Sequence, residues 1–246
     1  MSMPENEAAV ARPAGPGRVL RWCVYKMPGV MPTLHRVLRR MQMALLSYFR
    51  DPADAALISR VYRECKLELQ PLEAYAILSL ARAQAALDGD MAEVGMFQGG
   101  SAKLICAVKG DVPFWGFDTF EGLVDVGADD THWGTNFFRN GAYRADEAAV
   151  RRYLGDAPGV TLTKGFFPAS AGAAAGRRFS FVHLDVDTYA STLESLRFFW
   201  PRLVDRGVIV THDSHAVGVA RAAREFVAES GARTIPVGVS QLMFVR

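Results

Sequence analysis

The chain has 246 residues, half of which are hydrophobic, and a formal net charge of +2. This length suits one domain of ordinary size with a small appendage, and the nearly balanced charge argues against a nucleic-acid partner. Three widely spaced cysteines without a CxxC pair indicate neither a disulfide framework nor a cysteine zinc site. The N-terminus is acidic and no apolar run reaches about 20 residues, so we expect a soluble, cytoplasmic protein without a transmembrane segment.

The first 88 residues are expected to precede the main domain. Residues 1–17 are rich in Ala, Pro and Gly, which favours a disordered tail, and residues 18–88 are expected to form a helical extension or lid. Between residues 18 and 50 the chain is basic and carries no acidic residue, with apolar residues at helical spacing from Leu34 to Tyr48. This helix could contact an anionic membrane or an anionic substrate. It could equally pack on the domain or on a second subunit and leave its basic side in solvent.

Strands and helices alternate in the remaining part, residues 89–246. Strands are expected at 91–94, 113–117, 160–167, 179–184 and 207–211, with helical segments between them. This order predicts a doubly wound α/β fold with a parallel sheet. Two further strands, at 234–239 and 241–245, should form an antiparallel hairpin at one side of the sheet.

Two aspartates, Asp185 and Asp187, follow the apolar strand that begins at Phe179. Open α/β sheets bind ligands beyond the carboxyl ends of their strands, where these carboxylates are expected to lie. If strand geometry continues, one intervening residue points both side chains to the same side, so that they can share a site. The alternative is a strand end followed by a helix cap, because Asp is a favoured cap.

A glycine-rich turn follows the first strand, and Glu93 stands just before it. The turn lets the backbone approach a ligand closely, but its spacing is not GxGxxG, and a carboxylate there would repel phosphate. It suits a ligand that carries positive charge or hydroxyl groups. Asp118 ends the next strand about 20 residues later, at the place where an acidic residue commonly accepts hydrogen bonds from ribose hydroxyls. These features together indicate a nucleoside site.

The segment from Val124 to Tyr143 is irregular and rich in polar and aromatic residues. It is too long for a plain connection, so a lid or a substrate loop for a sugar or a polyphenol is one interpretation. A merely mobile loop is the other.

Three motifs resemble the macrocin O-methyltransferase family, whose members are class I S-adenosylmethionine-dependent enzymes acting on sugar hydroxyls of antibiotics and related glycosides. The motifs are Glu93-Val94-Gly95-x-x-x-Gly99-Gly100-Ser101, Gly116-Phe117-Asp118-Thr119-Phe120-Glu121-Gly122-Leu123 and Asp185-Val186-Asp187-Thr188-Tyr189-x-Ser191-Thr192-Leu193. The similarity covers about residues 70–246 and implies a Rossmann-like sheet with a C-terminal hairpin. It does not include the basic N-terminal segment.

The resemblance implies a role for each motif. The methionine end of S-adenosylmethionine would lie against Glu93, Gly95, Gly99, Gly100, Ser101 and Asp185. Asp118 would hold the ribose, and Thr119, Phe120 and Gly165 would border the adenine. The family often has an acidic residue after the aromatic-Pro pair of the third strand, whereas this chain has Ala169, which leaves that adenine contact in doubt.

The resemblance also implies a divalent metal ion, usually magnesium, whose ligands would be Asp185, His212 and Asp213. His212 departs from the family, which has a carboxylate there, and imidazole suits zinc, iron, nickel or copper better than magnesium. Either the metal differs, or His212 does not bind it, or metal dependence has been lost. His215 could compete as a ligand.

Proton removal from a sugar hydroxyl explains why a carboxylate and a cation would act together. The pKa of the hydroxyl is about ten units above that of an ordinary Asp, a gap on the order of 13 kcal/mol. A bound cation removes much of this gap. Asp187 is therefore the expected catalytic base, beside Asp185 as a ligand.

We expect a metal-assisted O-methyltransferase that acts on a hydroxyl of a small sugar or glycosylated natural product. One alternative is a catechol-type phenol as acceptor, whose lower pKa demands less of the base. Another is a non-catalytic nucleoside-binding or scaffolding protein of the same fold. A homo-oligomer formed through the N-terminal helices is also expected. A dinucleotide-dependent oxidoreductase is disfavoured by the glycine spacing.

Overall fold

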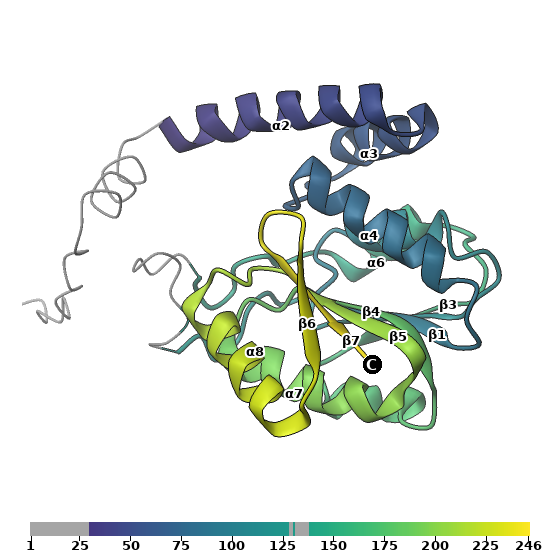
Figure 1. Ribbon diagram of the computed structural model, residues 1–246, viewed down its shortest axis with the longest axis vertical. Coiled ribbons are helices and arrows are strands. Elements are labelled where there is room, and N and C mark those ends of the chain that lie inside the picture. The colour runs from purple at the N-terminus through teal and green to yellow at the C-terminus, as the bar shows by residue number, and fades with distance from the viewer. Residues whose placement is uncertain (1–29, 128–129, 131–137) are drawn as a thin grey trace, which may run out of the picture.

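A seven-stranded sheet forms the centre of the molecule (Figure 1). The computed structural model describes residues 30–127, 130 and 138–246. Strands follow the order β3-β2-β1-β4-β5-β7-β6; the first five are parallel, and β7 is antiparallel to both β5 and β6. This arrangement confirms the predicted doubly wound fold and its terminal hairpin. The strands are β1 (Asp90–Val94), β2 (Phe114–Asp118), β3 (Val160–Lys164), β4 (Phe179–Leu184), β5 (Leu203–Thr211), β6 (Arg233–Val237) and β7 (Gln241–Val245).

Helices cover both faces of the sheet, with α4 on one side and α7 and α8 on the other (Figure 1). Local capping explains several of their starts: the side chains of Asp51, Asp146 and Thr188 accept hydrogen bonds from the first turns of α3, α6 and α7. The helices are α2 (Val30–Phe49), α3 (Pro52–Glu64), α4 (Pro71–Gln84), α5 (Gly100–Cys106), α6 (Glu147–Leu154), α7 (Tyr189–Phe199) and α8 (Val217–Ser230), with short 3₁₀ turns η1 (Ala169–Ala174) and η2 (Trp200–Arg202).

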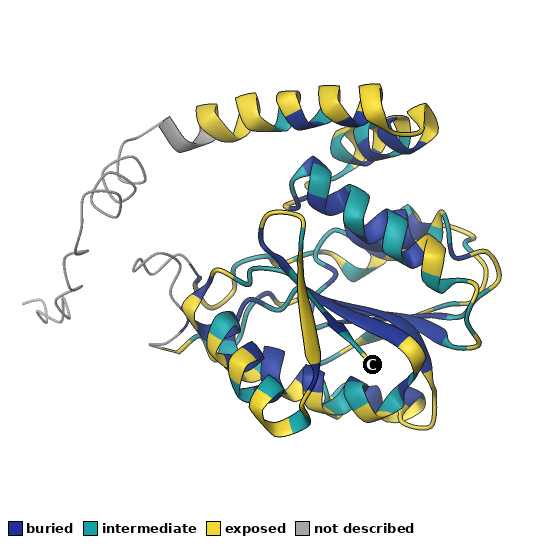
Figure 2. Ribbon diagram, viewed as in Figure 1, coloured by how far each residue is buried: buried dark blue, intermediate teal, exposed yellow. Residues whose placement is uncertain are grey.

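Two apolar clusters hold the layers together, one on each face of the sheet. Successive residues of β1 alternate between them: Met91 packs into the cluster under α3, α4 and α5, and Ala92 packs into the cluster under α7 and α8. All of β1 and β4 is buried, and Figure 2 shows the sheet as the buried centre of the chain. This is the pattern of central parallel strands covered on both sides.

The parallel ladder brings the carboxyl ends of the central strands to one level. Val94 pairs with Leu184, and Leu184 pairs with Thr211. The ladder continues one step further, because the backbone N–H of Asp185 donates to Val94 O at 2.9 Å and that of His212 donates to Leu184 O at 2.8 Å. The residues that follow β1, β4 and β5 are therefore fixed side by side at one edge.

The structure differs from the sequence predictions mainly at element boundaries. β5 begins at Leu203 instead of Gly207, and β3 ends at Lys164 instead of Phe167. The predicted tail, residues 1–17, and residues 128–129 and 131–137 of the predicted loop lie outside the described residues. Within the described part, no helix is both long and apolar enough to cross a bilayer.

The aromatic packing under α7 provides a test of the core. Phe199 is fully buried, and its ring lies 5.2 Å from that of Phe167 and 5.0 Å from that of Phe179. Phe199→Ala should lower the free energy of unfolding by about 3–5 kcal/mol, because it removes buried surface and leaves a cavity. Denaturant unfolding measures this change. Ile235→Ala, at an exposed edge position, should change the free energy of unfolding by less than about 0.5 kcal/mol. An equal loss in both variants would contradict the placement of Phe199 in the core.

Candidate functional site

A cavity of about 620 Å³ opens at the carboxyl edge of the sheet. Its size lies within the usual range for small-molecule sites. The ends of β1, β2, β4 and β5 form one part of its wall. Helices α2 and α4 and the β6–β7 turn form another, through residues that include Leu34, Leu38, Gln70, Glu73, Val239 and Ser240.

Asp118 anchors the glycine-rich turn to the end of β2. Its Oδ2 accepts hydrogen bonds from the backbone N–H groups of Met96 and Phe97, at 2.7 and 2.8 Å, and its Oδ1 accepts one from Phe120 at 2.6 Å. Burial raises the pKa of Asp118, and these three N–H groups oppose the rise. A carboxylate offers about four acceptor positions, so one remains on Asp118, which lines the cavity.

Gly95 permits close contact between the ends of β1 and β4. Its φ is +83°, and an added Cβ would lie 1.9 Å from the backbone oxygen of Asp185. No side chain fits this position. The absence of a Cβ therefore lets the glycine turn sit against the Asp185 segment at the base of the cavity.

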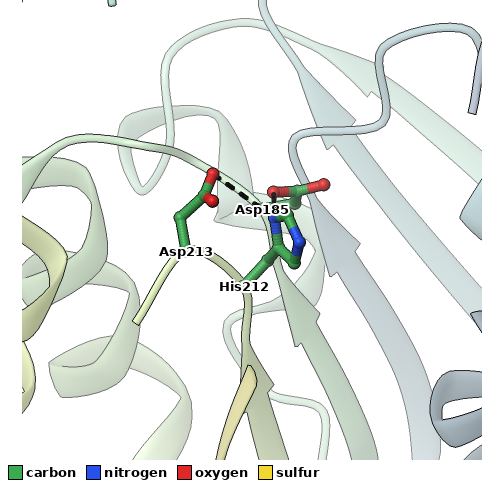
Figure 3. Close-up of side chains that lie close together, drawn as sticks. All are labelled: Asp185, His212 and Asp213. Carbon is green, nitrogen blue, oxygen red and sulfur yellow. Dashed lines mark hydrogen bonds and ion pairs between the residues drawn. The ribbon is translucent and has the colours of Figure 1, made fainter. Parts of the chain in front are cut away.

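The imidazole of His212 lies between the carboxylates of Asp185 and Asp213 (Figure 3). Its Nδ1 is 3.1 Å from Asp185 Oδ1 and 3.3 Å from Asp213 Oδ2. Burial opposes protonation of His212, but the two negative charges outweigh it and hold its pKa well above the usual value. For Asp213, burial favours the neutral acid, yet the charge and hydrogen bond of His212 lower its pKa.

Asp187 lies beside this cluster and is nearly buried. Burial, followed by the charges of Asp213 and Asp185, raises its pKa well above the ordinary value for an aspartate. Its φ of +63° is unusual for a residue with a side chain. Strand geometry therefore ends before Asp187, and a turn, rather than strand alternation, brings Asp187 to the site of Asp185.

Glu73, in the first turn of α4, approaches His212 from the other side. Its Oε2 is 3.4 Å from His212 Nε2 and accepts a hydrogen bond from the backbone N–H of Gln70. Its Oε1 accepts hydrogen bonds from the backbone N–H and the hydroxyl of Ser240. Burial favours the neutral form of Glu73, but the hydrogen bond and charge of His212, together with Ser240 and Gln70, lower its pKa to about 2.

The donor atoms of Asp185, His212 and Asp213 all lie within 4.8 Å of one another, so one ion could contact all three. Two carboxylates and one imidazole suit a divalent cation that accepts nitrogen. Magnesium, expected from the resemblance, prefers oxygen ligands alone. The donor set therefore fits a cation, and fits magnesium less well.

Most of the sequence-predicted site residues line this one cavity: Gly95, Gly100, Ser101, Asp118, Thr119, Gly165, Asp185, Asp187, His212 and Asp213. Glu93, Gly99 and Phe120 do not. Glu93 is fully buried below the cavity, where its Oε1 lies 2.6 Å from Nδ1 of His183. Glu93 is therefore paired with β4 in this structure, and its expected contact with a ligand stays a prediction. Gly99 caps α5, and Phe120 packs into the core.

Several residues of the cavity wall were not among the site residues predicted from the sequence. Glu73, Tyr143 and Ser195 carry polar groups there, and Leu34 and Leu38 come from α2. Glu73 had only a weak signal, because its capping pattern begins with Gln70 instead of Ser or Thr. The helices were expected to cover a site, but no sequence spacing indicates which of their residues reach it.

In a comparison with known protein families, residues 74–238 match the family described as macrocin-O-methyltransferase (TylF). A second match is to a Streptomyces olivaceus enzyme, 8-demethyl-8-(2,3-dimethoxy-alpha-L-rhamnosyl)-tetracenomycin-C 4'-O-methyltransferase. The two are 33% identical over 148 residues, which are 54% of this chain and 55% of that enzyme. The chain thus spans about half the length of this relative.

Solved structures share the fold. The calicheamicin methyltransferase CalS11 matches with a TM-score of 0.64 and 17% identity, over 95% of this chain and 98% of its own. The O-methyltransferase NovP matches with a TM-score of 0.61 and 22% identity, over 70% and 78% of the two chains. An O-methyltransferase from Bacillus cereus, solved in complex with SAH, has a TM-score of 0.57 and 12% identity over 86% and 100%.

The contact at Gly95 can be tested directly. Gly95→Ala should destabilise the fold and weaken binding of S-adenosylhomocysteine by at least tenfold, because the new methyl group collides with the backbone of Asp185 and separates the strand ends. Calorimetric titration and thermal unfolding measure both effects. Gly172→Ala is a matched control, since a Cβ there meets nothing within 4 Å. Unchanged binding in Gly95→Ala would show that this contact does not shape the site.

Proposed function

The chain belongs to the macrocin-O-methyltransferase family, and from this premise we propose that it is an S-adenosylmethionine-dependent O-methyltransferase acting on a sugar hydroxyl of a small acceptor. One observation carries the proposal: Asp118, Asp185, Asp187 and Asp213 surround a single cavity at the carboxyl edge of the sheet. The names of its relatives support a sugar-bearing acceptor, because one acts on a rhamnosyl-tetracenomycin and a CalS11 structure is titled a TDP-rhamnose 3'-O-methyltransferase.

The cofactor site proposed here matches the chemistry of a nucleoside with a positively charged sulfur. When bound, S-adenosylmethionine supplies a methyl group that is already activated on sulfur. Asp118 would accept a hydrogen bond from a ribose hydroxyl at its remaining acceptor position. The carboxylates of Asp185, Asp187 and Asp213 give the adjoining wall a negative potential that favours a cationic ligand. Gly95 keeps this wall close to the glycine turn.

Asp187 is proposed as the base that takes the proton of the acceptor hydroxyl. The pKa of Asp187 is raised, so it lies nearer to the pKa of the acceptor hydroxyl than that of an ordinary carboxylate does. A smaller difference between the two pKa values favours proton transfer. A divalent cation held by Asp185, His212 and Asp213 would supply a positive charge that lowers the pKa of the hydroxyl. The acceptor would then lie between these two groups.

Substitution of Asp187 separates chemistry from binding. Asp187→Asn should lower kcat by about 10²–10⁴-fold, because it removes the base and keeps the shape of the side chain. Binding of S-adenosylhomocysteine, measured by calorimetry, should change little. Asp205→Asn, on an exposed side chain at the start of β5, is the control and should keep full turnover. Full turnover in Asp187→Asn would disprove its role as base.

The choice of acceptor is tested with radiolabelled methyl donor on three compounds. Transfer to TDP-rhamnose or to a rhamnosyl-tetracenomycin supports the proposed function. Transfer to catechol alone favours the phenol alternative. Tight binding of S-adenosylhomocysteine without transfer to any of them favours a non-catalytic nucleoside-binding protein.

We also propose that the chain forms a dimer through α2. Seven large apolar side chains of this helix are between 37% and 81% exposed: Leu34, Val37, Leu38, Met41, Leu45, Tyr48 and Phe49. Figure 2 shows the helix as largely exposed. Together the seven side chains present on the order of 800 Å² of solvent-accessible surface per copy, about what each partner buries in a standard interface. Monomers rarely expose an apolar patch of this size.

A second copy explains this stripe better than an anionic membrane does. At 3.6 residues per turn, Arg36 lies nearly opposite the centre of the stripe and Arg40 about 120° from it, so neither would point into a lipid surface on which the stripe rests. Arg39 instead stacks on the ring of Tyr62 at 4.4 Å. Leu34 and Leu38 belong both to the stripe and to the cavity wall, so a second copy would lie at the cavity mouth.

The dimer is tested by its mass in solution. The wild type should sediment as a dimer, and Met41→Glu combined with Leu45→Glu should give a monomer, because two buried charges oppose the interface. Arg40→Glu, which lies outside the stripe, should remain dimeric. A monomeric wild type at tens of micromolar would disprove the dimer, and its binding to anionic vesicles would favour the membrane alternative.

A further inference from the structure

The Glu73 carboxylate is held rigidly where it meets His212. It is 2% exposed, and it receives a backbone N–H from Gln70 at 2.8 Å and one from Ser240 at 2.8 Å. The first belongs to the start of α4 and the second to the β6–β7 turn. Since both anchors are backbone groups, the carboxylate has little freedom to turn away from the imidazole.

The carboxylates around His212 face different nitrogens of its ring. A neutral imidazole has one N–H donor and one lone pair. Both nitrogens of His212 face carboxylates: Glu73 Oε2 lies 3.4 Å from Nε2, and Asp185 Oδ1 and Asp213 Oδ2 lie 3.1 and 3.3 Å from Nδ1. A cation that takes the lone pair of Nδ1 leaves the single N–H of the ring on Nε2, where Glu73 is the carboxylate that faces it. Nδ1 of His212 and the carboxylates of Asp185 and Asp213 then offer three electron-pair donors within 4.8 Å of one another, an arrangement that a cation stabilises.

We propose that Glu73 is a positioning residue that presents Nδ1 of His212 as a metal ligand, and that the site consequently prefers a nitrogen-accepting divalent cation of the zinc class over magnesium. A histidine that binds a metal commonly donates its other N–H to a carboxylate, which orients the ring and strengthens the ligand. Glu73 supplies that carboxylate from an element outside the sheet. This inference rests on the metal-binding part of the proposed function.

Two other roles for Glu73 make different predictions. If Glu73 only ties α4 to the hairpin, its loss lowers stability and leaves metal preference unchanged. If His212 stays protonated on both nitrogens and takes the place of a cation, the site binds neither metal. A measurement of metal affinity therefore separates all three.

The experiment is a calorimetric titration of the full chain with zinc chloride and, separately, magnesium chloride, together with thermal unfolding. The wild type should bind zinc at least 100-fold more tightly than magnesium. Glu73→Gln should weaken zinc binding by about 10–100-fold, because a neutral amide is a poorer acceptor for Nε2–H. Its affinity for magnesium should change little. Cobalt absorption spectra provide a second readout, since the bands of the bound ion should shift in Glu73→Gln.

Two further variants keep the test decisive. His212→Asp should reverse the preference toward magnesium, because all three ligands are then oxygens; it replaces Glu73→Gln if that variant does not fold. Ser240→Ala removes the hydroxyl hydrogen bond to Glu73 and leaves both backbone anchors and the contact with His212, so it should lower the melting temperature and keep the preference for zinc.

The inference is overturned if the wild type prefers magnesium, if it binds neither ion, or if Glu73→Gln binds zinc as tightly as the wild type does. Methyl transfer is measured separately on the same proteins. Transfer without any effect of Glu73 on zinc would overturn this inference alone. Zinc binding that depends on Glu73, without transfer to any acceptor, would count against the proposed function instead.

Discussion

One buried carboxylate, Glu73, joins three parts of the chain that are far apart in sequence. It closes the capping box of α4, binds Ser240 in the β6–β7 turn and meets His212 at the end of β5. A buried carboxylate is costly unless its oxygens are paired, so these partners must be in place together. The position of the N-terminal helices is thereby coupled to the geometry of the site, although none of these helices belongs to the sheet.

Much of the fold follows from local sequence patterns. Buried parallel strands read as continuous apolar runs, and β1, β2 and β4 were found within one residue of their starts because such runs have sharp polar ends. The hairpin was predicted because Gly238 lies between two short strand patterns, where a turn needs a residue that tolerates positive φ. β5 was placed too late because its first residues include Asp205 and Arg206, which are exposed and do not resemble a buried strand.

The candidate site was predictable where it follows from topology. Asp118 ends a parallel strand, and Asp185 and His212 each follow one, so their proximity needs only the order of strands. For Glu93 the resemblance predicts a ligand contact, but it does not reveal that the register sets Glu93 beside His183 in the sheet interior. The approach of Glu73 depends on how α4 packs across the sheet edge, and no local pattern encodes that packing.

The electrostatics of the cavity explain why its proposed ligands are cations. Burial raises the pKa of Asp187, and Asp213 and Asp185 raise it further, since adjacent carboxylates resist ionising together. His212 offsets part of this negative charge from a position between two of them. A positive charge bound beside Asp187 favours its ionised form, which is the form that accepts a proton. The repulsion between these carboxylates therefore favours binding of a cationic methyl donor or a metal ion, and either one increases the fraction of Asp187 that is ionised and able to accept a proton when an acceptor is bound.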